Sequence, residues 1–341
     1  MKKMGRIKKI ILISAVSFLA LYGVGGTIAG MIVPNLTMNG RGIDPKDSLT
    51  ARQFKLREDF PLLAEPKDYS FTSGGNTLVG HFYEAESPRG TAIFAHGMNS
   101  SSGGPEAVIE DYLLQEGYDV FAIDLTAHGE SEGNTKISLR QSAFDVEAAY
   151  ACLLKENQLS DNVLLAGYSW GGYGVAEAAA TIQPNKLLTF SAYDCAYEEM
   201  LESSVELAGP IMYATVPTFA LATVITHGQK DFDKASSHVP EETRVFAVQG
   251  KQDTRVPLSI SFAKGIENRR NSRVFYLDAT HMIPWISASA REYVDSLKEG
   301  LSAAKKASKE EQDAFISSVD KEKSSALDAA LVEELNDFLS E

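Results

Sequence analysis

The chain has 341 residues, of which 44% are hydrophobic, so it can bury a substantial core as one large domain or two small ones. Its formal net charge is −14, and because residues 1–9 hold five Lys and Arg side chains, the remainder carries −19. Such an acidic body argues against a nucleic-acid partner, because phosphate contacts require clustered cations. The two cysteines, Cys152 and Cys195, are too few for a disulfide scaffold.

The N-terminal segment predicts a membrane anchor. Residues 1–9 are basic, and residues 10–34 contain no charged side chain, which is a length that can cross a bilayer of about 30 Å. Positive residues on the short side predict a cytoplasmic N-terminus, so we expect a single-pass cell-membrane protein with its catalytic domain outside the cytoplasm. A cleaved signal peptide is the alternative, but its shorter apolar region and A-x-A-like site are not clear here.

The remaining chain predicts one α/β domain. Residues 35–66 mix Asn, Gly, Pro and charges without periodicity, which is typical of a linker. Over residues 67–300, short apolar runs alternate with stretches of helical length, such as 138–157 and 171–182. Near-continuous apolar strands separated by helices predict a mostly parallel sheet with helices on both faces. The strand-like runs are TLVGHFY, TAIFAHG, DVFAIDL, NVLLAGYS, KLLTFSAYD, RVFAVQG and RVFYLDA.

Two segments depart from this alternation. Residues 195–243 are too long for an ordinary connection, so we expect a lid insertion over the site. Its stretch 208–226 is uncharged and could be considered a second membrane span. We do not favour such a span, because it would place Ser169 and His281 on opposite sides of the bilayer. Residues 301–341 form a polar tail in which leucines recur every four residues at positions 327, 331, 335 and 339, which predicts a docked amphipathic helix.

The sequence Gly167-Tyr168-Ser169-Trp170-Gly171 follows an apolar strand and precedes a helix-like stretch. This is the context of a nucleophile elbow, in which a strained turn pushes a serine hydroxyl out of the sheet. The motif alone is weak, because a Gly-rich turn can match it by chance. Its position between strand and helix favours Ser169 as a nucleophile.

A serine hydroxyl needs a base to take its proton, usually a histidine oriented by a carboxylate. His281 follows the last predicted strand, where a loop can return it to Ser169; a surface histidine is the alternative. Asp253 follows the preceding strand and gives the chain order Ser, Asp, His that is typical of this hydrolase class. Asp194, at the end of an earlier strand, is the competing acid.

An oxyanion that develops during acyl transfer needs backbone N–H donors. One is expected from the residue after the nucleophile and one from the loop after the third strand. These residues are Trp170 and Met98, and the Ser/Gly-rich stretch that follows Met98 indicates a loop. We expect His96, just before it, to support this loop.

From about residue 69 to residue 300, the chain resembles the α/β-hydrolase superfamily. Three signatures lie in the family's order: HGM after the third strand, DLTAHGES after the fourth and GYSWG after the fifth. Family members often have Arg-Gly where this chain has Thr126-Ala127, which affects the local turn and not the triad. Within the superfamily, the chain is similar to membrane-anchored bacterial hydrolases of the monoacylglycerol lipase, Bem46-like and serine aminopeptidase-like types.

These features predict a serine hydrolase that cleaves acyl esters, as a carboxylesterase or lysophospholipase-like enzyme, acting on small acyl substrates that include lipid-derived ones. Peptide-bond hydrolysis of the serine aminopeptidase-like type is an alternative, because the acyl-enzyme chemistry is shared. An acidic pocket for a free amine would favour it. A catalytically silent binding protein with a hydrolase fold is a third possibility. No cofactor or metal is expected, because the chain has neither H-E-x-x-H nor a phosphate loop.

Overall fold

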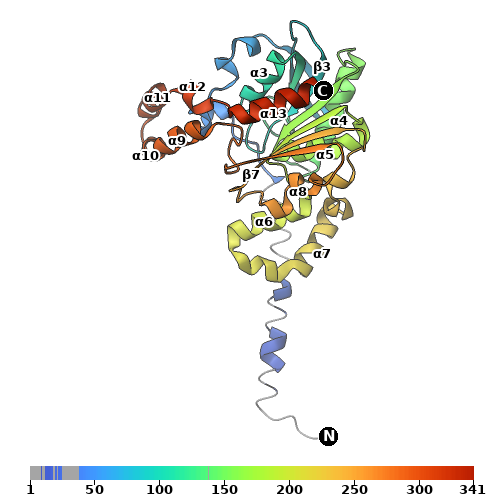
Figure 1. Ribbon diagram of the computed structural model, residues 1–341. Helices are drawn as coiled ribbons and strands as arrows, with labels where there is room; N and C mark the ends of the chain where they lie inside the picture. The colour runs from blue at the N-terminus through green and yellow to red at the C-terminus, as the bar shows by residue number, and fades with distance from the viewer. Residues whose placement is uncertain (1–8, 10–11, 18–19, 21, 25–37, 137) are drawn as a thin grey trace.

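A central eight-stranded sheet organises the computed structural model, which describes residues 9, 12–17, 20, 22–24, 38–136 and 138–341 (Figure 1). The strand order is β1-β2-β4-β3-β5-β6-β7-β8; β2 pairs antiparallel with both β1 and β4, and the other neighbours are parallel. The predicted α/β class with a mostly parallel sheet is therefore confirmed. The strands are β1 Lys67–Ser73, β2 Asn76–Tyr83, β3 Gly90–Ala95, β4 Tyr118–Ile123, β5 Val163–Tyr168, β6 Lys186–Phe190, β7 Arg244–Gly250 and β8 Ser272–Leu277.

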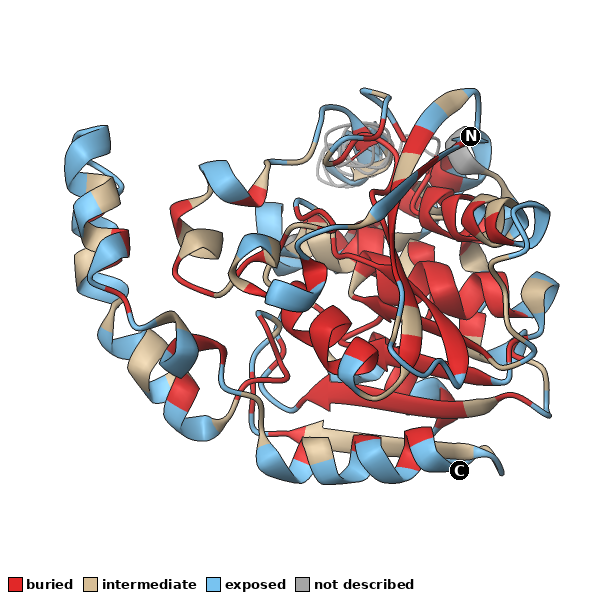
Figure 2. Ribbon diagram, turned by 90° about the horizontal axis from the view of Figure 1, so that it is seen from above, coloured by how far each residue is buried: buried red, intermediate tan, exposed pale blue. Residues whose placement is uncertain are grey.

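Helices cover both faces of this sheet, and the central strands are buried throughout (Figure 2). Because side chains alternate along a strand, Ile93 of β3 joins one apolar core and the adjacent Phe94 joins the other. Helices α4, α5 and α8 pack in the first core, and α3 and α13 pack in the second. These helices span α3 Ala107–Gln115, α4 Gln141–Lys155, α5 Trp170–Ile182, α8 Phe262–Ile266 and α13 Ala329–Ser340.

The other helical elements lie at the edges of the fold. Helices α6 and α7 connect β6 to β7 and project from one end of the molecule, whereas α9 to α12 form an arm (Figure 1). The helices are α2 Leu49–Arg52, α6 Ala196–Ala208, α7 Val216–His227, α9 Ala288–Ser296, α10 Lys298–Ala304, α11 Lys309–Ser317 and α12 Lys321–Ser325. The 3-10 helices are η1 Pro45–Asp47, η2 Arg57–Asp59, η3 Pro61–Leu63, η4 Pro210–Thr215, η5 Gln229–Phe232, η6 Ala235–Ser237 and η7 Leu258–Ile260.

The segment from residue 38 onward and the C-terminal tail both pack against the domain. The segment expected to be a linker is ordered from residue 38 onward, and Phe54, Phe60 and Leu63 are buried in the same core as α3. In the tail, Leu331, Leu335 and Leu339 face that core from α13. Leu327 precedes this helix and pairs with Ile286 in an isolated β-bridge.

The prediction of a transmembrane anchor over residues 10–34, and with it a single-pass cell-membrane location, is corrected by the structure. In the described ranges of the chain, no helix combines the length and the apolar character needed to cross a membrane. Residues 10–11, 18–19, 21 and 25–34 of the predicted span lie outside these ranges. The prediction relied on length and absence of charge alone, and these two properties do not by themselves specify a helix.

Candidate active site

Ser169 occupies the turn that joins β5 to α5. Its backbone has φ 51° and ψ −112°, a strained conformation for a residue with a side chain. The turn closes only because its neighbours are glycines: a Cβ on Gly171 would lie 2.1 Å from the carbonyl oxygen of Ala95, and one on Gly167 would lie 2.6 Å from the carbonyl oxygen of Gly171. The local sequence thus fixes the serine where β5 ends.

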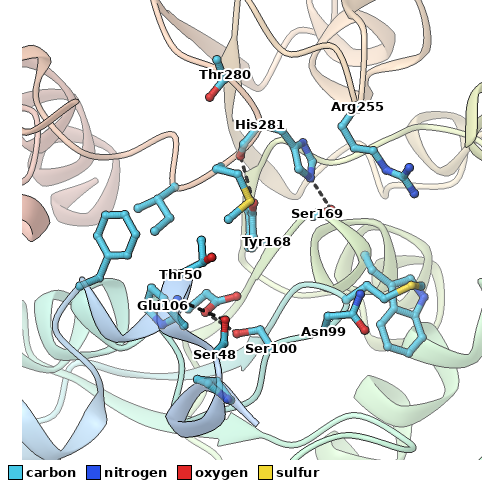
Figure 3. A pocket seen from close by; sticks show the side chains of 18 of the residues that line it. Ser48, Thr50, Asn99, Ser100, Glu106, Tyr168, Ser169, Arg255, Thr280 and His281 are labelled. Atoms are coloured by element: carbon cyan, nitrogen blue, oxygen red, sulfur yellow. Dashed lines mark hydrogen bonds between the residues drawn. The ribbon is translucent and has the colours of Figure 1, made fainter. Parts of the chain in front are cut away.

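His281 lies in the loop after β8, and the structure brings it to Ser169 (Figure 3). Its Nε2 is 2.9 Å from Oγ of Ser169, and its Nδ1 is 2.8 Å from Oδ2 of Asp253. Because Nδ1 faces a carboxylate, we assign the ring proton to Nδ1, which leaves Nε2 free to accept from the serine hydroxyl. The hydroxyl of Tyr168 donates to the backbone carbonyl of His281 at 3.0 Å and fixes this loop.

Asp253 is buried and held by several donors. Its Oδ1 accepts hydrogen bonds from the backbone N–H groups of Arg255 and Val256, at 3.0 and 2.8 Å. The side-chain amide of Gln249 donates to Oδ2 at 3.1 Å. These bonds orient the carboxylate toward His281.

The competing acid, Asp194, lies elsewhere. Its carboxylate accepts hydrogen bonds from the backbone N–H and the hydroxyl of Ser236, both at 2.8 Å. Burial raises the pKa of this carboxyl group, and the bonds from Ser236 oppose that rise. The contacts of Asp194 therefore fasten the chain beyond α7 to the end of β6.

The two residues expected to supply the oxyanion donors both line the pocket. Trp170 begins α5, so its N–H has no partner within the helix, and Met98 lies in the loop after β3. Within the described residues, neither N–H donates to another protein group. The indole of Trp170 instead donates to the carbonyl of Leu139 at 2.7 Å, which anchors the first turn of the helix.

The N–H groups around Met98 are almost all engaged. Gly97 donates to the Glu106 carboxylate at 3.3 Å, and Asn99 donates to Nε2 of His128 at 3.2 Å. Ser100 donates to the carbonyl of Gly97 through its N–H and to Glu106 through its hydroxyl, at 3.2 and 2.7 Å. The loop is therefore tied down on both sides of Met98 while its N–H stays available for a ligand oxygen.

The histidine before this loop, His96, is buried, and its Nδ1 lies 2.7 Å from the carbonyl oxygen of Gly97. Its Nε2 accepts a hydrogen bond from the backbone N–H of Leu125 at 3.1 Å. His96 thus links the loop after β3 to the loop after β4, as expected of a supporting residue.

A pocket of about 600 Å³ opens above Ser169, a size that suits a small ligand. Its apolar side is formed by side chains from three separate segments: Phe54, Met98, Met282, Ile283 and Trp285. Ser48 and Thr50, from the N-terminal segment, lie opposite Arg255 in Figure 3. From the expected insertion, the lining residues are Glu199, Met200 and Ser203 of α6.

Glu199 places a buried carboxylate at this pocket. One of its oxygens lies 3.2 Å from the Arg255 guanidinium and accepts from the hydroxyl of Ser203, whereas the other is buried without a hydrogen-bond partner among the described residues. Burial raises the pKa of Glu199 to about 8, and Arg255 opposes this rise.

A serine on a strained turn after a central strand, with its acid and histidine on later loops, is the arrangement of the α/β-hydrolase fold, and this chain has that fold. The family described as serine aminopeptidase, S33, matches residues 86–283. Because that match covers more than half of the chain, the protein belongs to this family and is a serine hydrolase.

Solved structures show the same fold. An esterase from Pyrococcus furiosus is 20% identical with a TM-score of 0.54, and the alignment covers 78% of this chain and 98% of that one. An α/β hydrolase from Penicillium sp. sh18 is 16% identical with a TM-score of 0.50, over 75% of this chain and 99% of that one.

A match to a much longer curated protein covers only a small part of it. The multifunctional-autoprocessing repeats-in-toxin of Vibrio cholerae serotype O1 is 24% identical over 231 residues, which are 65% of this chain and 5% of the toxin.

Sequence reasoning missed Glu106, His128 and Glu199 as residues of this site. His128 lies in a recognised motif, but its contact with Asn99 joins loops after different strands. Glu106 precedes α3, where an acidic residue is ordinarily a solvated helix start. No local pattern in the sequence marks His128 or Glu106 as buried.

Proposed function

We propose that this protein hydrolyses acyl esters, as a carboxylesterase or lysophospholipase-like enzyme, with Ser169, His281 and Asp253 as its catalytic triad. The observation that carries the proposal is the continuous hydrogen-bonded series from Ser169 through His281 to Asp253, at 2.9 and 2.8 Å, beside a pocket. This geometry meets the requirement that a base lie within about 2.6–3.2 Å of the nucleophile.

In the proposed reaction, Oγ of Ser169 attacks the ester carbonyl carbon while its proton passes to Nε2 of His281. The N–H groups of Met98 and Trp170 stabilise the negative oxygen of the tetrahedral intermediate. The intermediate expels the alcohol, which takes the proton from His281, and the acyl group remains on Ser169. Water then attacks the acyl carbon, gives its proton to His281, and releases the carboxylic acid with the serine restored.

The lining of the pocket supports an ester with an apolar acyl group. Phe54, Ile283 and Trp285 provide an apolar wall, and each methylene buried against such a wall contributes about 0.8 kcal/mol. The P. furiosus structure of the same fold is described as an esterase, which is consistent with this choice.

A second candidate, the removal of an N-terminal residue from a short peptide, is favoured by one observation. One buried oxygen of Glu199 at the pocket has no hydrogen-bond partner among the described residues, and the carboxyl group, once ionised, offers a counter-charge to the free amine of such a substrate. The name of the matching family agrees with it.

The deciding experiment compares p-nitrophenyl esters of increasing chain length with aminoacyl p-nitroanilides. Ester hydrolysis that strengthens with chain length supports the first proposal, and a clear preference for the anilides with a free amine supports the second. Ser169→Ala should abolish both activities and the labelling by a fluorophosphonate. Labelling that survives this substitution would exclude Ser169 as the nucleophile.

A further inference from the structure

Two walls of the pocket come from segments that are not strands of the sheet. Phe54 belongs to the N-terminal segment that follows α2, and Trp285 belongs to the loop beyond His281. Neither segment has a strand ladder to fix its position. Contacts with other parts of the chain must therefore set the distance between these walls.

Residues 321–328 of the tail, here called the clamp, bond to the first wall on both sides of Phe54. The hydroxyl of Ser324 donates to the carbonyl of Gln53 at 2.6 Å. The backbone N–H of Lys55 donates to Oγ of Ser325 at 2.8 Å. Both serines are buried, so loss of either hydroxyl would leave a backbone group without its partner.

The same clamp bonds to the second wall on both sides of Ile286. The backbone N–H of Asp328 donates to the carbonyl of Trp285 at 2.9 Å, and the N–H of Ser287 donates to the carbonyl of Ala326 at 2.8 Å. A stretch of eight residues thus joins two pocket walls that lie more than 200 residues apart in sequence.

Ion pairs between the tail and the N-terminal segment add to this attachment. Arg52 pairs with Asp313 at 2.7 Å, Lys55 with Glu322 at 2.8 Å, and Lys321 with Asp59 at 2.6 Å. Leu49 packs in a small apolar cluster with residues of α10 and α11. These contacts join the tail to the wall segment directly.

We propose that the clamp sets the width of the pocket and so selects substrates by acyl-chain length, an inference that rests on the proposed esterase function. Ser324 and Ser325 are positioning residues, because they act through Phe54 and touch no reacting atom. A loosened clamp lets the wall of Phe54 move away from that of Trp285, and long acyl chains lose contacts that acetate never makes. Each methylene that loses its contact lowers kcat/KM about fourfold.

The test uses the full chain with Ser324→Ala combined with Ser325→Ala. Ser317→Ala, at an exposed tail position whose hydroxyl donates to the carbonyl of Asp313 within α11, is the matched control. We expect the double variant to lower the octanoate-to-acetate ratio of kcat/KM at least tenfold, with acetate turnover within about twofold of the parent. The control should match the parent. An unchanged ratio, or an equal loss on both esters, would overturn the proposal.

A second pair of variants covers the case in which the double variant does not fold. Arg52→Asp should lower the ratio by about two- to fivefold, as expected for loss of a partly exposed pair, and Asp313→Arg in the same chain should restore it. Failure of the exchanged pair to restore a lowered ratio, or no change in Arg52→Asp, would contradict the clamp.

The clamp hypothesis and the esterase proposal can be tested separately. The test compares the rates at which short-alkyl and long-alkyl fluorophosphonates label Ser169. If the parent hydrolyses no ester, the esterase proposal fails, but the labelling ratio still measures pocket width. A parent and clamp variants with the same labelling ratio would then contradict the clamp by itself.

Discussion

Nε2 of His128 accepts a hydrogen bond from the backbone N–H of Asn99, the residue next to Met98, at 3.2 Å. Nδ1 of the same ring lies 2.9 Å from the carbonyl oxygen of Thr126, which can only accept, so the proton belongs on Nδ1. Burial lowers the pKa of His128 to about 2, so the ring is neutral near pH 7. A neutral imidazole therefore holds the loop that presents the N–H of Met98.

His128→Ala should lower kcat by about 10- to 100-fold with little change in KM, which is less than the loss of an oxyanion donor itself. Asn99 loses its acceptor, and the N–H of Met98 moves away from the oxyanion. Steady-state kinetics on acetate and octanoate esters measure the change. The affinity for a trifluoromethyl ketone, which forms a tetrahedral adduct, should fall in parallel with kcat/KM.

His128→Gln offers an amide oxygen to Asn99 and should restore part of the activity. His238→Gln, at a partly exposed position whose ring faces Glu177, is the control and should behave as the parent. If His128→Ala raises KM and leaves kcat and adduct affinity intact, the residue does not position the oxyanion loop.

The same histidine should make the protein sensitive to acid. Its pKa is lowered to about 2 in the folded state from an ordinary 6.5, so the unfolded chain binds the proton more readily. The folded state therefore loses stability as pH falls below 6.5, by about 1.4 kcal/mol for each pH unit. Urea unfolding at pH 7 and pH 5 measures this slope, and it should be smaller in His128→Gln. Equal slopes in the two proteins would refute the assignment.

Glu199 should have the opposite effect at higher pH. Its pKa is raised to about 8 from an ordinary 4.5, so the folded state holds a proton that the unfolded chain releases. This contribution is present below pH 4.5 and is lost as pH rises toward 8, by about 1.4 kcal/mol for each pH unit. Glu199→Gln should therefore lose less stability than the parent between pH 5 and pH 8. Equal losses in the two proteins would mean that Glu199 is ionised throughout this range.

The sequence predicted those parts of the fold whose signals are local. Central strands such as β5 and β7 are continuous apolar runs, and the elbow at Ser169 is defined by five consecutive residues. The edge strand β1 was missed because only two of its inward-facing side chains, Tyr69 and Phe71, are apolar, and the third, Ser73, is polar. Buried and exposed side chains alternate along this strand, but the stretch is too short to be distinguished by its sequence from the irregular segment before it.

Long-range contacts account for the remaining differences. The bonds from Ser324 and Ser325 to the N-terminal segment join residues about 270 positions apart, and nothing in either sequence segment specifies the other. The segment at Phe54 therefore looked like a linker although it lines the pocket. The positions of Ser169 and His281 were more predictable than the segments that form the pocket walls, because each of these two residues follows a recognisable strand.

The last prediction concerns the acid of the proposed triad. Asp253→Asn should reduce kcat severely, since the amide cannot stabilise the imidazolium of His281 as Ser169 gives up its proton; the corresponding change in a serine protease costs about 10⁴-fold. The amide also presents a donor toward Nδ1, which favours the wrong tautomer. Ester turnover and fluorophosphonate labelling measure the loss.

Asp194→Asn is the matched control, because it makes the same chemical change in a buried carboxylate that bonds to Ser236 instead of His281. It should retain most of the activity and lose stability by about 1–3 kcal/mol, as expected when a buried hydrogen-bonding group is altered. Urea unfolding of both variants separates loss of folding from loss of catalysis. An inactive Asp194→Asn enzyme beside a nearly normal Asp253→Asn enzyme would transfer the role of the acid from the loop after β7 to the end of β6.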